Sequence, residues 1–314
     1  MNERIVFMGT PEFAANVLEG LIRASYNITA VVTQPDKKVG RKNILTPSPV
    51  KETALRYGIP VFTPVRIKDD YEDILKTEPD LIITSAYGQF VPVELIEYPR
   101  YRAINTHGSL LPQYRGGAPI QWSIINGEEK TGISIIYMTK GMDKGDILYR
   151  KEIPIDIRDT NSTLFRKLSD LALECLLEFL PDLFAGNFRA EPQKEEEATF
   201  AYNLSKSDEF ISFNDRTRRV YDHIRGLLDD PGAYGILKGK KYKFMKVFYA
   251  EAEGTKPGLF RGLESDYLRI DCLDGFIKVY EIKPEGKNTM DARSFYNGNG
   301  RNLVGEYFSD TYEE

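Results

Sequence analysis

The sequence is poor in the residues from which many sites are built, with two cysteines and two histidines in 314 residues. Cys175 and Cys272 lie far apart without metal-ligand spacing, so we expect free thiols in a reducing compartment and neither a disulfide framework nor a metal site. No apolar run approaches the ~20 residues that a membrane helix needs. The N-terminal segment has an early acidic residue and only a short apolar core, unlike a signal peptide, and no Arg- and Ser-rich transit segment precedes the first expected strand. These absences predict a cytoplasmic protein without a membrane partner, and a mitochondrial origin stays open as the alternative.

What is present is typical of a globular protein, with 41% hydrophobic and 28% charged residues. The length predicts about two domains. The net charge of −5 argues against indiscriminate nucleic-acid binding but leaves room for a local basic patch.

The first half of the chain alternates strand and helix patterns. Residues 4–8 and 28–33 are short apolar runs, and the segment between them repeats at helical spacing, which predicts a β-α-β unit. Strand-like runs and a long amphipathic helix at 163–186 continue the pattern. We therefore predict an α/β fold over residues 1–190, a Rossmann-like, mostly parallel sheet with helices on both faces. The turn after the first strand lacks the glycines of G-x-G-x-x-G, so a plain turn is favoured over a dinucleotide site.

The second half has a different character. Residues 191–207 are charged and lack apolar periodicity, which indicates a linker. Residues 208–314 contain short β-like runs separated by Gly, Pro and Asp turns, which predicts a small C-terminal β-barrel of the OB-like kind. Residues 206–246 hold ten basic and six acidic residues. Their "KGKKYKFMK" mixes lysines with aromatics as nucleic-acid surfaces do, but lysines that guard an edge strand are the alternative.

A long connection at residues 33–49 has no regular pattern and carries clustered basic residues. The segment contains only one acidic residue, Asp36, against four basic ones: Lys37, Lys38, Arg41 and Lys42. Long irregular connections inside α/β units are often functional, and these charges suit a polyanionic partner. An ordinary solvated loop is the alternative.

The stretch "AINTH" ends an expected strand. Asn105 and His107 are two residues apart, so their side chains point to the same side, at the strand end where ligands bind in parallel sheets. Asn offers an amide donor for a developing oxyanion, and His donates or shuttles protons. The loop at 139–148 adds Asp143 and Asp146, and a carboxylate beside a histidine orients its ring. A buried histidine satisfied by backbone, and a solvated Asp-Gly turn, are the alternatives.

"NTHGSLLPQYRGGAPIQW" together with "MDKGDIL" resembles the signature of the folate-dependent formyltransferases. In that superfamily an Asn, a His and a downstream Asp form the catalytic set. Asn105, His107 and Asp143 fall on these positions, whereas Asp146 does not. Gly108 stands where Ala is common, and the Gly form is also familiar from sugar-nucleotide formyltransferases.

Ordered motifs from near residue 5 to about residue 235 resemble the methionyl-tRNA formyltransferase family in particular, among them "MGTPEFA", "LTPSPVK", "AYGQFVP" and "GDIL". This resemblance implies 10-formyltetrahydrofolate as formyl donor, methionyl initiator tRNA as acceptor, no metal, and a monomer. It implies a folate site at Ser109, Leu110, Leu111 and Pro112, with main-chain contacts from Gly88, Gln89, Phe90 and Val91. It assigns tRNA contacts to Arg41, with Lys42, Lys37 and Lys38 beside it.

Three alternatives stay open at this point. A sugar-nucleotide N-formyltransferase shares the catalytic residues but has no reason for the basic loop or for "LTPSPVK". A hydrolase of formyl-folate uses water in place of the amine. A non-catalytic tRNA-binding factor belongs to a different class, and the intact Asn, His and Asp set argues against it.

Overall fold

The computed structural model describes residues 2–40 and 43–312. They form two units, and the chain passes between them several times. The N-terminal unit contains the chain up to 116 together with 131–153 and 165–201, and the C-terminal unit contains 117–130, 154–164 and 202 onward. The linear boundaries expected at 190 and 208 stay a prediction.

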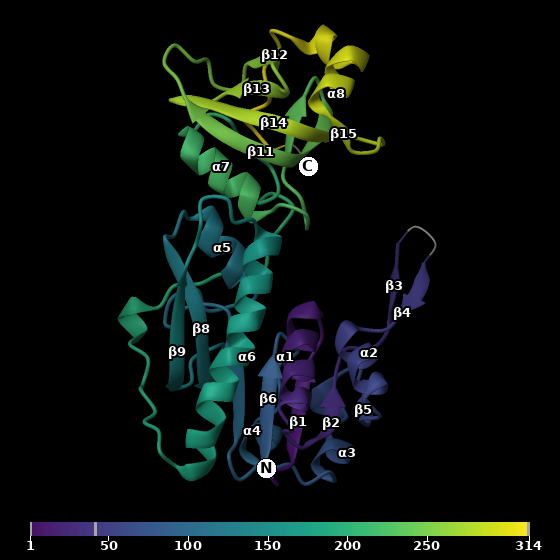
Figure 1. Ribbon diagram of the computed structural model, residues 1–314, viewed down its shortest axis with the longest axis vertical. Helices are drawn as coiled ribbons and strands as arrows, with labels where there is room; N and C mark the ends of the chain where they lie inside the picture. The colour runs from purple at the N-terminus through teal and green to yellow at the C-terminus, as the bar shows by residue number, and fades with distance from the viewer. Residues whose placement is uncertain (1, 41–42, 313–314) are drawn as a thin grey trace. The chain divides into compact units, whose positions relative to one another are not determined.

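The N-terminal unit is built on a seven-stranded sheet (Figure 1). Its strand order is β5 (Val61–Phe62), β2 (Ile28–Val32), β1 (Ile5–Gly9), β6 (Leu81–Ser85), β7 (Ala103–His107), β8 (Lys130–Tyr137) and β9 (Ile147–Pro154). The first five strands run parallel and β8 runs antiparallel to β7. The predicted mostly parallel α/β sheet is confirmed. Its central strands β1, β6 and β7 are buried at nearly every position because both faces are covered.

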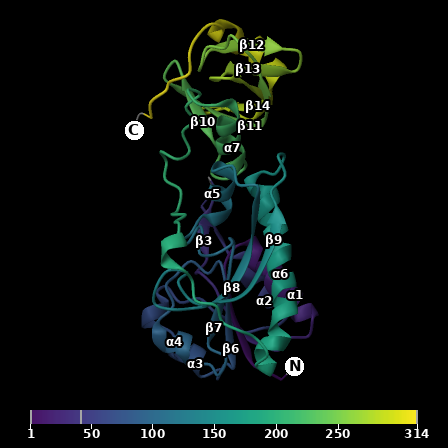
Figure 2. The same ribbon diagram turned by 90° about the vertical axis from the view of Figure 1, so that its left-hand side faces the viewer.

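Helices cover the two faces of this sheet (Figures 1 and 2). The helices α1 (Glu12–Arg23) and α6 (Asn161–Ala185, from Phe165 on within this unit) lie on one face. The short helices α3 (Glu72–Leu75) and α4 (Val93–Glu97) lie on the other, where Ile74 and Leu95 pack against Val6 and Met8 of β1. The helix α2 (Pro49–Arg56) begins at Ser48, whose hydroxyl accepts the amide of Lys51 and caps the first turn. Two 3₁₀ turns, Ile67–Asp69 and Glu195–Glu197, complete the unit.

The basic connection is more regular than its sequence indicated. The strands β3 (Lys37–Val39) and β4 (Ile44–Thr46) pair antiparallel as a two-stranded ribbon. The expectation of an irregular connection is wrong here, because three-residue exposed strands show too few positions for any periodicity to emerge. Arg41 and Lys42 lie outside the described residues.

The C-terminal unit is an antiparallel sheet that closes on itself. Its order is β10 (Tyr234–Leu237), β11 (Lys240–Glu251), β14 (Gly275–Pro284), β13 (Tyr267–Asp271) and β12 (Phe260–Glu264), with β15 (Met290–Asp291) paired to β14. Tyr307 bridges to Leu259 and Phe308 bridges to Leu237, so one C-terminal segment joins both edges. The expected small β-barrel is confirmed. Helices α7 (Thr217–Gly226) and α8 (Ala292–Gly298) and the 3₁₀ turn Gly300–Leu303 pack with it.

Helix α5 (Pro119–Ile125) belongs to the C-terminal unit because it packs on α7. A Cβ on Gly226 of α7 would lie 2.7 Å from the Ile125 side chain, so only glycine permits this approach. Arg225 is fully buried beside it and donates from Nη1 to the carbonyls of Asp156 and Asp159. These contacts attach two segments from the middle of the chain to the C-terminal unit. None of the described helices is both long and apolar enough to cross a membrane.

Candidate active site

Asn105 lies near the carboxyl end of β7, between β6 and β8. It pairs in register with Thr84 of β6 and with Ile136 of β8. The Thr84 hydroxyl lies 2.8 Å from Asn105 Oδ1, to which it donates. This bond occupies the oxygen end of the amide and leaves the Nδ2 end as a donor pointing away from Thr84.

His107 closes the same strand and is 5% exposed. Its Nε2 lies 2.8 Å from the carbonyl oxygen of Tyr114, and its Nδ1 lies 3.6 Å from Asp143 Oδ2. A carbonyl can only accept, so Nε2 carries a proton. Tyr114 has a φ of 60°, a left-handed conformation that costs a non-glycine residue about 1–2 kcal/mol. The ring of His107 therefore lies between the Tyr114 carbonyl at Nε2 and the Asp143 carboxylate at Nδ1.

Asp143 reaches His107 from the loop between β8 and β9. Its Oδ2 also accepts the amide of Gly116 at 3.0 Å. Asp146 has a different role from Asp143. Its main-chain carbonyl accepts a hydrogen bond from the Tyr137 amide in the turn between the two strands. The structure thus brings Asp143 to His107, and Asn105 stands two residues before His107 on one strand. That these three act in catalysis stays a prediction.

The segment expected to hold the folate rings is a tight turn after β7. Ser109 Oγ donates to the Gln113 carbonyl at 2.6 Å, and Ser134 Oγ donates to the Ser109 carbonyl at 2.7 Å. Leu111 is fully buried and packs with Ile136 and Ile147. The Ser109 and Leu111 side chains therefore belong to the interior, whereas Leu110 and Pro112 are half-buried and keep part of their surface available.

The second expected folate segment, Gly88 to Val91, follows β6. Gln89 ties it to the neighbouring loops, because its Oε1 accepts the Ile67 amide at 2.8 Å and its Nε2 donates to the Pro64 carbonyl at 3.2 Å. Val91 is buried in the core, whereas Phe90 is 78% exposed. Gly88 has a φ of 87°, which a side chain would strain. The turn exposes one aromatic ring and is held in place by Gln89.

Three residues near this site carried no functional expectation from sequence: Thr84, Arg115 and Gln193. Arg115 is fully buried and bonds to Gln193, which in turn bonds to the Asp143 loop. Arg115 lies inside the quoted "YRGG" motif, and an arginine beside two glycines was the only signal. Gln193 lies in the expected linker, where no pattern distinguished it.

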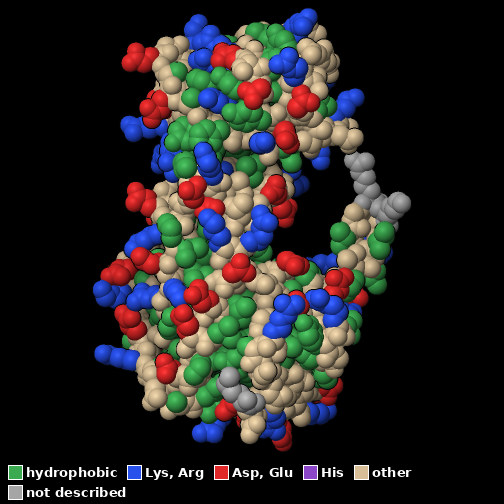
Figure 3. Space-filling model, in the orientation of Figure 1, with side chains coloured by type: hydrophobic (Ala, Val, Ile, Leu, Met, Phe, Trp, Pro, Cys, Tyr) green, Lys and Arg blue, Asp and Glu red, His purple; other side chains and the backbone are tan. Residues whose placement is uncertain are grey.

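The predicted tRNA-contacting lysines are exposed. Lys37 and Lys38 lie on β3 of the ribbon. The same ribbon exposes Val39, Ile44 and Leu45, at 55%, 60% and 62%. In Figure 3 hydrophobic side chains are prominent on this arm of the N-terminal unit. The predicted Arg41 and Lys42 are not among the described residues.

The basic segment of the C-terminal unit has local partners. Lys241 Nζ lies 4.6 Å from the centre of the Tyr234 ring, and Lys243 Nζ donates to the Pro231 carbonyl at 2.7 Å. Both lysines are on β11, with β10 beside them. These contacts agree with lysines that protect a sheet, and they leave the choice between this alternative and a nucleic-acid surface open.

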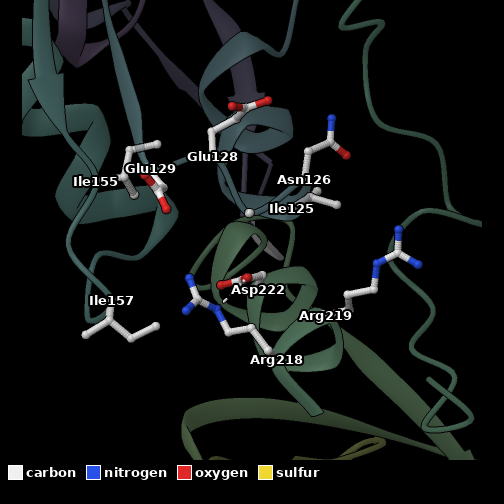
Figure 4. A pocket seen from close by; sticks show the side chains of 10 residues that line it. Ile125, Asn126, Glu128, Glu129, Ile155, Ile157, Arg218, Arg219 and Asp222 are labelled. Carbon is white, nitrogen blue, oxygen red and sulfur yellow. Dashed lines mark hydrogen bonds and ion pairs between the residues drawn. The ribbon is translucent and has the colours of Figure 1, made fainter. Parts of the chain in front are cut away.

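A cavity of about 460 Å³ lies within the C-terminal unit (Figure 4). Its wall carries Arg218 and Arg219 together with Glu128, Glu129 and Asp222. The Arg218 guanidinium is paired with Asp222 at 2.7 Å. The acids outnumber the arginines, so this cavity offers no excess of positive charge to a phosphate.

Both cysteines are free and buried. Burial raises the pKa of the Cys175 thiol and of the Cys272 thiol to about 12 each. Neither is therefore a reactive thiolate at neutral pH. Over residues 2–40 and 43–312, no group of three or more His, Cys, Asp and Glu side chains is placed to hold a metal ion.

Comparisons with known proteins give a consistent result. Residues 3–180 match the family described as formyl transferase, and residues 203–300 match the formyl transferase C-terminal domain. The chain is 46% identical to a methionyl-tRNA formyltransferase of Ligilactobacillus salivarius, over 95% of this chain and 96% of that protein. It is 44% identical to a methionyl-tRNA formyltransferase of Listeria monocytogenes, over 96% and 97%.

A solved structure shares the fold at lower identity. It is the N-formyltransferase from Helicobacter canadensis in complex with folinic acid and dTDP-3-aminofucose. It is 20% identical, with a TM-score of 0.68 over 89% of this chain and 99% of that chain. At this identity the likeness concerns the fold alone.

Proposed function

The chain belongs to the formyl transferase family, and on this premise we propose that it transfers a formyl group from 10-formyltetrahydrofolate to the α-amine of methionine carried by initiator tRNA. The observation that carries the proposal is the identity of 44–46% with methionyl-tRNA formyltransferases over nearly the whole chain. The fold relative in complex with folinic acid, a formylated tetrahydrofolate, supports the choice of donor.

Asn105 stabilises the charge that develops during transfer. When an amine attacks a formyl carbon, negative charge grows on the formyl oxygen. The Asn105 amide, held at its oxygen end by Thr84, directs its nitrogen away from that bond and donates to this oxygen. One preorganised donor of this kind contributes about 3 kcal/mol to transition-state stabilisation.

His107 is the second donor, and Asp143 orients it. With both nitrogens protonated, His107 keeps Nδ1 toward Asp143 and exchanges the Tyr114 carbonyl for the formyl oxygen at Nε2. Asp143 also relays the proton lost by the attacking amine through water. Ser109 is not a nucleophile, because its hydroxyl donates to the Gln113 carbonyl and is not paired with His107. Transfer is therefore direct, without a covalent enzyme intermediate: the bond from the methionine amine to the formyl carbon forms, the bond from that carbon to N10 of the folate breaks, and the proton lost by the amine goes to N10, so that tetrahydrofolate leaves.

The folate rings lie against the half-buried side chains of Leu110 and Pro112 and beside the exposed ring of Phe90. Main-chain groups from Gly88 to Val91 bind the polar edge of the pterin. Flat rings in concave, mostly apolar sites with a few fixed polar groups are the usual arrangement for such ligands.

The basic ribbon contacts the tRNA. Lys37 and Lys38 on β3, together with Arg41 and Lys42 of the same connection in the sequence, supply charges for phosphates. The exposed apolar residues of the same ribbon offer surface for the unpaired or frayed end of an acceptor arm. This assignment explains why the chain has the β3–β4 ribbon, which an enzyme that formylates a sugar nucleotide does not require.

The test is formyl transfer to methionyl initiator tRNA by wild type, His107→Ala, Arg41→Ala and Arg23→Ala. Arg23 is an exposed arginine of α1 and serves as the matched control. We expect an active wild type, a large loss of turnover in His107→Ala, a loss mainly of tRNA acceptance in Arg41→Ala, and an unchanged control. A wild type that formylates an amino-sugar nucleotide but not the tRNA refutes the acceptor, and one that only hydrolyses the donor refutes transfer.

A further inference from the structure

A buried arginine and a glutamine from the segment after α6 form one connected group. Arg115 is fully buried, and its Nε and Nη2 donate to Gln193 Oε1 at 3.0 and 2.9 Å. Its Nη1 donates to the Glu195 carboxylate at 2.9 Å. An arginine without exposed surface is stable only if its donors are satisfied, so this pairing is required by burial.

Gln193 passes this contact on to the Asp143 loop. Its Nε2 donates to the carbonyls of Asp143 and Gly145, both at 2.7 Å. A guanidinium only donates and a carbonyl only accepts, so the two ends of the Gln193 amide cannot be exchanged. All hydrogen-bonding groups of this side chain are in use, and its orientation is fixed from both sides.

The loop that Gln193 holds needs such support. Asp143 has a φ of 50°, a conformation that non-glycine residues keep only where the surroundings enforce it. A Cβ on Gly145 would lie 1.7 Å from the Tyr137 carbonyl, so the loop lies tightly against β8. Gly116, next to Arg115, donates its amide to the Asp143 carboxylate. The 115–116 segment therefore fixes Asp143 in two ways. The Gly116 amide binds the Asp143 carboxylate, and the Arg115 side chain holds Gln193, which binds the Asp143 carbonyl.

We propose that Arg115 and Gln193 are positioning residues that keep the Asp143 carboxylate 3.6 Å from His107 Nδ1. This inference rests on the proposed function, in which Asp143 orients His107. Neither residue touches substrate. Without the two bonds from Gln193, the left-handed Asp143 relaxes and its carboxylate leaves the ring. A residue of the expected linker then supports the reaction centre through Asp143.

The first test compares Gln193→Ala and Gln193→Glu with wild type in the transfer assay. Gln193→Glu is isosteric and keeps the acceptor for Arg115 but loses the donors for the loop. We expect kcat to fall about 10- to 100-fold in both, as for misplaced catalytic groups, with KM for both substrates within about threefold. The matched control is Asn16→Ala, which removes an amide that joins α1 to Ser169 and Asp170 of α6, and its kcat should be unchanged.

A double-mutant cycle separates positioning from general support. In an Asp143→Ala background, Gln193→Ala should reduce kcat by about twofold or less, because it acts through a group already absent. Hydrogen exchange of the peptide covering 139–147 should accelerate in Gln193→Ala and stay unchanged in Asn16→Ala. A wild type inactive on the tRNA refutes the proposed function. If the wild type is active, three results overturn this inference. Gln193→Ala keeps the wild-type kcat, it keeps the wild-type hydrogen-exchange protection of the loop, or it lowers kcat as much in the Asp143→Ala background as in wild type.

Discussion

Replacing Asn105 by alanine tests the chemistry most directly. The substitution removes the amide donor and leaves the half-buried strand position otherwise intact. Removing one oxyanion donor typically lowers kcat by about 100- to 1,000-fold, or roughly 3–4 kcal/mol. We expect KM for both substrates to change little, because this bond strengthens only as charge develops.

The neighbour Thr84 provides a graded version of the same test. Thr84→Val keeps the shape of the side chain and removes the hydroxyl that donates to Asn105. The Asn105 amide then remains in the site, but the hydrogen bond that orients it is lost. A single hydrogen bond contributes about 0.5–1.5 kcal/mol, so kcat should fall about 2- to 10-fold.

Thr106→Val is the matched control. Thr106 is also buried in the sheet, and its hydroxyl donates to Ser85 Oγ at 2.9 Å, on the opposite side of β7 from Asn105. It should lose a similar amount of stability without loss of kcat. Single-turnover formyl transfer under saturating donor is the assay. A loss below about threefold in Asn105→Ala, or an equal loss in the two Thr→Val variants, would refute the oxyanion role assigned from these distances.

Three further predictions concern stability, pH and tRNA. Arg225→Met should lower the free energy of unfolding by about 3 kcal/mol, because the buried Asp222 carboxylate then keeps only Arg218 as a cationic partner. A melting temperature equal to that of wild type contradicts this. Burial lowers the pKa of His223 below its ordinary value of 6.5, so the unfolded chain binds this proton first and stability falls as pH falls below 6.5. Urea unfolding between about pH 7.5 and 5.5 should therefore show a smaller acid loss for His223→Gln than for wild type, and equal slopes contradict it. Lys37→Gln combined with Lys38→Gln should raise KM for tRNA and reduce its logarithmic salt slope by about 1 per lysine, and an unchanged slope contradicts phosphate contact.

The sequence was sufficient for the elements that bury a regular pattern. β1 is an apolar run because it is buried in a sheet that is covered on both faces, and α6 repeats at helical spacing because one side of the helix is buried. Asn105 and His107 were singled out as a polar pair at the end of an expected strand, but their catalytic role was predicted only through the resemblance to the formyltransferases, because a buried histidine satisfied by backbone explains such a pair as well. Their place at the carboxyl end of a parallel strand followed from the fold class.

Other features depend on contacts between distant parts of the chain. Arg115 and Gln193 are 78 positions apart, and neither residue type indicates its partner. Asn105 was visible from sequence, but the hydroxyl that orients it was not, because Thr in a strand ordinarily reports only β propensity. The assignment of α5 to the C-terminal unit was equally hidden, since its pattern is that of any short buried helix.

The passage of the chain between its two units has a consequence for synthesis. Ile125 of α5 packs against the core of the C-terminal unit, which includes Val220 and Ile224 of α7, and α7 begins only at Thr217. At about 5–20 residues per second, the ribosome delivers α5 on the order of ten seconds before its partner exists. During this interval the nascent chain presents apolar surface that its partner helix does not yet cover. A product truncated after residue 201 remains in this state permanently, so such a fragment should bind holdase chaperones and aggregate rather than behave as a separate domain.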